Sequence, residues 1–110
     1  MPRNPKTTEP RGFRLETNGS GDLVAHGVLD FANARDALRQ GEQVLEPGRD
    51  GRLDLSELDR VDSAGLAVII EWLSWYESAG TRLALDAVPE QLRDLARISE
   101  LEDLLGMSGA

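Results

Sequence analysis

Apolar and polar residues alternate in two stretches near the start of the chain, which is the pattern of half-buried β-strands. The first stretch covers residues 13–17 (FRLET) and the second covers residues 23–29 (LVAHGVL), with the turn-forming segment 18–22 (NGSGD) between them. Two alternating runs joined by such a segment predict a β-hairpin. Residues 52–56 (RLDLS) and 81–86 (TRLALD) predict two further strands.

In the segments between and after these strands, apolar residues recur at helical spacing, which predicts helices. Residues 31–45 are expected to form a helix capped by Asp30, although Gly41 weakens the pattern. A helix over residues 89–98 has proline in its first turn, which is a favoured position for that residue. Residues 99–105 predict a last short helix.

The longest helical pattern is central in the chain. It begins at Ser63 or Ala64 and ends at Ser78, and Gly80 follows where a left-handed residue often ends a helix. The predicted order is therefore β-β-α-β-α-β-α-α. Strands joined through helices must run parallel, so the order predicts an α/β fold. It consists of a mixed sheet of about four strands packed against helices, with the hairpin as its antiparallel part.

The chain has the size of one domain. The 110 residues divide into an N-terminal tail at 1–11, expected to be flexible because it is rich in proline and charge, a domain at 12–106 and a C-terminal tail at 107–110. The tail has no apolar segment of the kind that signal peptides carry. The longest apolar run, residues 66–70, is far shorter than the roughly 20 residues of a membrane span. These features predict a cytoplasmic protein without direct membrane insertion.

Charge and cysteine content narrow the choice of partner. The formal net charge of −8 opposes binding to nucleic acid, because that binding depends on lysine and arginine neutralising phosphates. It also opposes binding to an anionic membrane surface. A protein partner with a basic surface remains compatible with this charge. The absence of cysteine excludes disulfides and thiolate metal sites.

The turn that starts the central helix is the most informative segment. Asp62 or Ser63 can accept hydrogen bonds from the free backbone N–H groups of the first helical turn. Gly65 allows another backbone to approach closely, and the helix start carries partial positive charge. Ser63 is therefore either a simple cap or a cap that also contacts a partner.

The central helix carries apolar residues on two sides, because successive helical residues advance by about 100°. The ordinary core stripe consists of Leu66, Ile69, Ile70 and Leu73. The nearly opposite side presents Ala64, Val68, Trp72 and Trp75. A helix that covers a sheet needs one apolar face. The second face is thus either a docking stripe, which tryptophan favours, or it packs under the C-terminal helices.

Other candidate sites carry little chemistry. His26 is the only histidine, so a zinc site or a Ser-His-Asp triad has no basis. The carboxylates Asp54, Glu57, Asp59 and Asp62 match no calcium-loop spacing and are interpreted as a solvated, partly capping surface. Phe31 is either a core residue at the helix entry or an interface contact. We therefore expect no catalysis, no metal and no cofactor.

Three segments together resemble the STAS domain, the SpoIIAA-like fold of anti-sigma factor antagonists. They are DLSELDRVDSAGLAVI (54–69), GTRLAL (80–85) and PEQLRDLARISELEDLL (89–105). Within that family the chain is most similar to the MlaB-type subunit, through GVLDF (27–31) and VDSAGLAVIIEWL (61–73). Antagonists more often have a glycine-rich central helix and a TGL turn near the end, where this chain has residues 98–101.

The MlaB likeness implies a non-enzymatic accessory subunit that binds and stabilises the cytoplasmic ATPase (MlaF-like) of a phospholipid-transporting ABC complex. Through that complex it would be associated with a membrane. The partner-binding residues would be Phe31, Asp62, Ser63, Ala64, Gly65, Leu66, Val68, Trp72 and Trp75. The alternative is an anti-sigma factor antagonist, because Ser63 matches the phosphoacceptor of that group and its partner would be an anti-sigma factor kinase.

Overall fold

The computed structural model describes residues 12–18 and 22–106, so the tails predicted at 1–11 and 107–110 lie outside the described residues. The elements follow in the order β1 (Phe13–Thr17), β2 (Asp22–Leu29), α1 (Ala34–Val44), β3 (Gly51–Val61), α2 (Ser63–Ser78), β4 (Leu83–Asp86) and α3 (Glu90–Ile98). The α/β fold and the alternation of strands and helices are thus confirmed. The predicted last helix is wrong, since residues 102–106 form turns.

The four strands form one mixed sheet in the order β1-β2-β3-β4. β1 and β2 pair antiparallel as the predicted hairpin. β2, β3 and β4 pair parallel, as strands joined through helices must. β3 is longer than predicted and extends to Val61, directly before the turn at Asp62.

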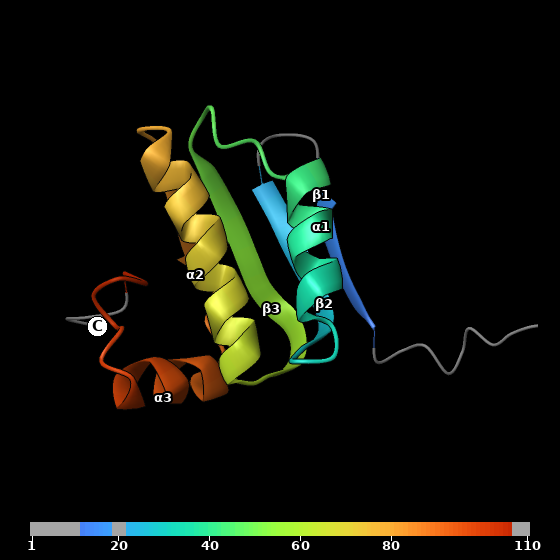
Figure 1. The fold of residues 1–110 in the computed structure, drawn as a ribbon, viewed down its shortest axis with the longest axis vertical. Helices are drawn as coiled ribbons and strands as arrows, with labels where there is room; N and C mark the ends of the chain where they lie inside the picture. The colour runs from blue at the N-terminus through green and yellow to red at the C-terminus, as the bar shows by residue number, and fades with distance from the viewer. Residues whose placement is uncertain (1–11, 19–21, 107–110) are drawn as a thin grey trace, which may run out of the picture.

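The helices are arranged around this sheet so that two helix starts meet at one end. Figure 1 shows α1 and α2 side by side against one face of the sheet, both beginning at the end where β2 and β3 finish. α3 lies across that same end of the sheet, near the start of α2. The loop after β2 and the turn after β3 are therefore neighbours.

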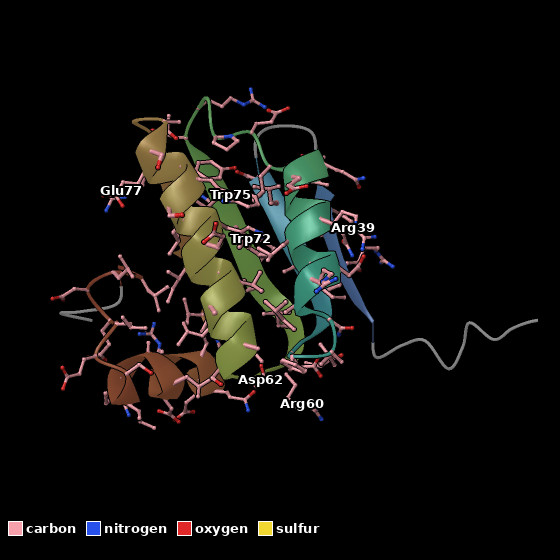
Figure 2. All side chains as sticks on the ribbon, viewed as in Figure 1. Arg39, Arg60, Asp62, Trp72, Trp75 and Glu77 are labelled. Atoms are coloured by element: carbon pink, nitrogen blue, oxygen red, sulfur yellow. The ribbon has the colours of Figure 1, made fainter. Side chains whose placement is uncertain are left out.

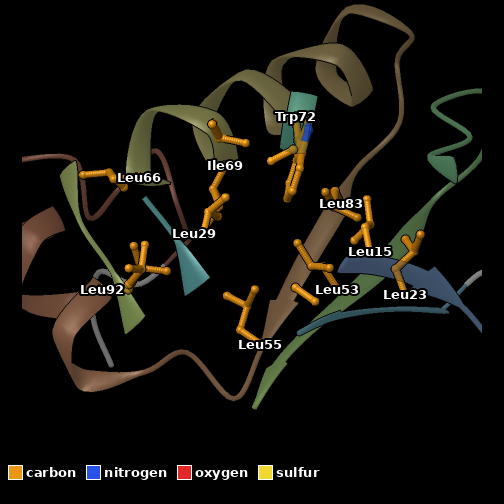
Figure 3. Packing of buried hydrophobic residues seen from close by; sticks show 14 of the residues in the cluster. Leu15, Leu23, Leu29, Leu53, Leu55, Leu66, Ile69, Trp72, Leu83 and Leu92 are labelled. Carbon is orange, nitrogen blue, oxygen red and sulfur yellow. The ribbon is translucent and has the colours of Figure 1, made fainter. Parts of the chain in front are cut away.

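The core fills the layer between the sheet and the two long helices. Its largest fully buried side chains include Trp72 and Tyr76 from α2, and Leu53 and Leu55 from β3. Figure 3 shows Trp72, Leu53 and Leu55 within this core. In the middle of the sheet the apolar side chains point toward the helices, while the alternate residues, such as Arg52, remain exposed. This alternation is the pattern that predicted the strands.

The ends of α2 and α3 explain why the predicted end of α2 is right and why the last predicted helix is absent. Gly80, at φ 79°, ends α2 with Thr81 N–H bonded to the carbonyl of Tyr76 at 2.9 Å, as expected for glycine after a helix. Glu100, at φ 60°, ends α3 in the same way without glycine, because the N–H of Leu101 bonds to the carbonyl of Ala96 at 2.7 Å. Because this left-handed residue lies within residues 99–105, the helix predicted there does not form.

Candidate functional site

Asp62 holds the turn between β3 and α2 with both of its carboxylate oxygens. Asp62 is the N-cap of α2, and its Oδ1 accepts the N–H of Gly65 at 3.0 Å. Its Oδ2 accepts the N–H of Phe31 at 3.2 Å. Capping by Asp62 confirms one of the two predicted caps, and Ser63 is instead the first helical residue.

Gly65 allows the start of α2 to pack directly on the end of β2. A Cβ atom at position 65 would lie 2.3 Å from the carbonyl oxygen of Leu29, a contact no side chain could occupy. The N–H of Asp62 donates to the same oxygen at 3.3 Å. The predicted close backbone approach at Gly65 is thus confirmed, and it fixes the turn against the sheet.

The loop after β2 presents Phe31 to solvent. Phe31 is 83% exposed, so the interpretation of Phe31 as a core residue at the helix entry is wrong. The reason is that α1 starts later than expected, at Ala34 with Asn33 as its N-cap. Asp30 does not cap the helix. Its Oδ1 accepts the N–H of Asn33 at 3.1 Å and closes the turn that carries Phe31 outward.

Four exposed residues therefore form one patch at the end of the molecule where α1 and α2 begin. We call this patch the Phe31–Ser63 surface, and it consists of Phe31, Arg60, Asp62 and Ser63. Nη2 of Arg60 lies 3.9 Å from Oδ2 of Asp30. Figure 2 shows Arg60 and Asp62 at the end of the molecule where α2 begins. Ala64 lies half-buried at its edge. The patch combines an aromatic ring, a hydroxyl and charges of both signs.

The expected docking stripe on α2 is wrong for two of its residues. Val68 is 3% exposed and Trp72 is fully buried. The cover is α1 rather than the C-terminal helices, because a Cβ at Gly41 of α1 would lie 2.4 Å from Nε1 of Trp72. The Phe13 ring lies 6.0 Å from the Trp72 ring. Because α1 lies beside α2 on the same face of the sheet, it covers a side of α2 that the sheet alone would leave exposed.

Two other predicted contact residues are also buried. Gly65 and Leu66 are buried, so neither forms part of the exposed Phe31–Ser63 surface. Trp75 differs from Trp72 because it is half-buried at the rim of α2. Its Nε1 donates to Oε2 of Glu71 at 3.1 Å.

Two other polar side chains that the sequence analysis considered, His26 and Asp54, have partners within the structure. Nε2 of His26 lies 3.2 Å from Oε1 of Glu16. The backbone N–H of Ser56 donates to Asp54 at 2.8 Å and holds the pKa of that carboxyl below its usual range. Across residues 12–18 and 22–106, no cluster of three or more histidine, cysteine, aspartate or glutamate residues has the geometry of a metal site. No helix within this part of the chain is long and apolar enough to cross a membrane.

Solved structures share this architecture. The anti-sigma factor antagonist SpoIIAA in its unphosphorylated form has 17% identity and a TM-score of 0.63, with 84% of each chain covered. A putative anti-sigma factor antagonist from Thermotoga maritima has 21% identity and a TM-score of 0.58, with 83% of this chain and 80% of that chain covered. At these identities the likeness establishes the fold.

A much larger protein contains the same fold as one part. The murine Solute Carrier 26 family member A9 anion transporter has 22% identity and a TM-score of 0.56 over 86% of this chain, which spans 16% of the transporter chain. No curated protein sequence matches significantly. The family model described as "Mlab, STAS domain" matches residues 14–106, which is most of the chain. The chain belongs to the STAS domain family.

Proposed function

We propose that this protein is a non-enzymatic accessory subunit that docks onto another protein through the Phe31–Ser63 surface. STAS domains are generally regulatory binding modules. An aromatic side chain that is 83% exposed is costly to leave in water and is typical of interface anchors. The hydrogen bond from Phe31 N–H to Asp62 carries the proposal. It holds this ring beside the exposed start of α2 before any partner arrives.

The partner that we propose is the cytoplasmic ATPase subunit of a phospholipid-transporting ABC complex, as for an MlaB-like subunit. The match to a family model described as "Mlab, STAS domain" supports this choice. The formal net charge of −8 suits a partner with a basic surface. In this role the protein acts in the cytoplasm, reaches the membrane through the complex and stabilises the ATPase. It needs no cofactor.

A second function is favoured by the position of Ser63. Its side chain is exposed at the first residue of α2 and it does not serve as the cap. A kinase therefore has access to the hydroxyl, as an anti-sigma factor antagonist regulated by phosphorylation requires. A phosphate adds about −1.5 to −2 charges next to the Asp62 carboxylate, which would change what the Phe31–Ser63 surface binds.

Identification of what co-purifies separates the two functions. The chain is expressed with an affinity tag from its own genetic locus, and the bound proteins are identified by mass spectrometry. An ABC-type ATPase in stoichiometric amount is the expected result. An anti-sigma factor kinase in its place, together with a mass increase of one phosphate that Ser63→Ala removes, would establish the second function. Recovery of neither protein contradicts both.

A further inference from the structure

An open groove runs along the boundary between α1 and α2, away from the Phe31–Ser63 surface. Trp75 lies on the side of α2 that faces α1 (Figure 2). The groove has a volume of about 410 Å³ and is lined by Gly41, Glu42, Leu45, Pro47, Glu71 and Trp75. Of the four residues in the predicted stripe on α2, Trp75 alone lines this groove.

The floor of the groove is apolar. Gly41 has no side chain, and the space that its Cβ would occupy is filled by the Trp72 indole. Leu45 is 7% exposed beneath the groove, and the indole of Trp75 is half-buried along its wall. A segment that enters here therefore meets backbone, a leucine and an aromatic face, with room for a long side chain.

The two rims of the groove carry carboxylates without a basic partner. Glu42 projects from α1 and Glu71 from α2, and both are exposed. Neither has an ion pair with any residue in the part of the chain that the structure describes, whereas nearby Glu46 lies 2.8 Å from Arg49. The bond from Trp75 Nε1 fixes the Glu71 carboxylate at the edge of the indole.

An aromatic face beside two carboxylates that have no ion pair is the environment that an arginine side chain prefers. The guanidinium group stacks on tryptophan through a cation–π interaction. It donates from a flat, fixed fork to carboxylates, and its stem covers apolar surface. A bare metal ion fits poorly, because the rims offer two carboxylates and the remaining lining is apolar or backbone.

We propose that this groove binds an arginine side chain of the protein partner. The complementarity of charge supports it, since the domain is acidic and these two carboxylates are left unpaired. The groove also lies on the same helical layer as the Phe31–Ser63 surface. Trp75 follows Ser63 by 12 positions on one helix, or roughly 18 Å, and a standard interface of about 800 Å² on each partner spans that distance. The inference rests on the proposed docking function for the identity of the partner.

A titration with a small probe tests the groove by itself. The probe is N-acetyl-L-argininamide, and the control is N-acetyl-L-citrullinamide, which has nearly the same shape without the charge. Chemical shifts of the ¹⁵N-labelled full chain are followed at the Trp75 indole N–H and at the Gly41 amide. We expect a saturable shift with the arginine probe at millimolar concentration and a much smaller one with citrulline.

Variants show which groups respond. Glu42→Gln with Glu71→Gln is expected to weaken the arginine probe about fivefold or more, the size of exposed cation and carboxylate contacts. The buried Trp72 indole signal reports that the fold is kept. Phe31→Ser is expected to bind the probe as the wild type does. Failure of the groove is thus distinguishable from failure of the Phe31–Ser63 surface.

Three results would overturn the proposal. The first is the absence of a saturable shift, and the second is an equal response to citrulline or to the double glutamine variant. The third concerns the basic residues of the chain's own N-terminal segment. If Arg3→Gln, Lys6→Gln and Arg11→Gln together shift the Trp75 indole signal before probe is added and tighten probe binding, that segment is the occupant instead of a partner.

Discussion

The backbone N–H of Phe31 donates to Oδ2 of Asp62 at 3.2 Å and thereby joins two segments that lie 31 positions apart in the chain. The other oxygen of the same carboxylate caps α2 through Gly65. One side chain thus sets the start of the helix and the position of an exposed aromatic ring. The Phe31–Ser63 surface depends on both bonds.

Replacement of Asp62 should therefore change both the free energy of unfolding and the mobility of the loop that carries Phe31. Asp62→Ala is expected to lower the free energy of unfolding by about 1–2 kcal/mol, the usual cost of losing an N-cap. Asp62→Asn should cost less, since its single amide oxygen can still cap α2 through Gly65, but it cannot also accept the N–H of Phe31. Urea unfolding measures both variants, and hydrogen exchange of the Phe31 amide should accelerate in the alanine variant. Unchanged stability and exchange in Asp62→Ala would contradict the assigned role.

Gly65 and Gly48 form a matched pair for testing the contact between α2 and β2. Gly65→Ala places a methyl group 2.3 Å from the backbone oxygen of Leu29, and backbone cannot move aside as a flexible side chain can. We expect a loss of about 1–3 kcal/mol or more. Gly48 has no atom within 4 Å of its Cβ position, so Gly48→Ala should be neutral or slightly stabilising. Equal melting temperatures for the two variants would refute the packing.

Tyr76 provides the pH dependence of the core. Burial raises the pKa of its phenol above the usual value of 10.0, against the opposing effect of the hydrogen bond from the Glu46 N–H. A raised pKa in the folded state means that the stabilisation is fully present below about pH 10. It is lost as the pH rises through the folded pKa.

Tyr76 is the only tyrosine, so absorbance near 295 nm follows it directly. The midpoint should lie above 10 in the native protein and return to about 10 in denaturant. Tyr76→Phe should remove this part of the alkaline loss of stability. A native midpoint at or below that of the denatured chain would be inconsistent with a buried phenol.

Ser63 separates binding from stability. Because Asp62 is the cap, Ser63→Ala should leave the free energy of unfolding within about 0.5 kcal/mol of the wild type. Ser63→Asp should be neutral or stabilising by up to about 1 kcal/mol, since negative charge is favourable at a helix start. The same aspartate should weaken partner binding by roughly tenfold, because a larger, charged side chain replaces the small hydroxyl in the packed contact and has to be desolvated there. Calorimetric titration with the purified partner measures the change, and binding equal to that of Ser63→Ala would contradict it.

Much of the fold could be predicted because its signals are local. Alternation marked β1 and β2, and Gly80 marked the end of α2. The end of α3 at Ile98 was also predicted, whereas the absence of a helix after it was not, because Glu100 adopts the left-handed conformation that glycine usually takes. The start of α1 was predicted too early, at Phe31 after an Asp30 cap, because the Asp30 carboxylate instead closes the turn at Asn33 and α1 begins at Ala34.

The candidate site was predictable at its turn and not on its helix. Asp62 and Gly65 act through neighbours close in sequence or through backbone, so their types and spacing were informative. Whether Trp72 faced solvent depended on where α1 lies, and the absence of a side chain at Gly41 is the feature that allows α1 to cover it. In the sequence that glycine appeared only as a weakness in a helical pattern.

Binding of Phe31→Ser to the partner tests the central claim most directly. Phe31 and Ile98 are 83% and 79% exposed, so serine at either position should leave stability nearly unchanged. The purified ATPase is titrated with wild type, Phe31→Ser and Ile98→Ser. Docking through the Phe31–Ser63 surface predicts that Phe31→Ser loses at least about tenfold in affinity, as for an interface anchor, while Ile98→Ser binds as the wild type does. Equal affinity of Phe31→Ser and wild type would contradict the account.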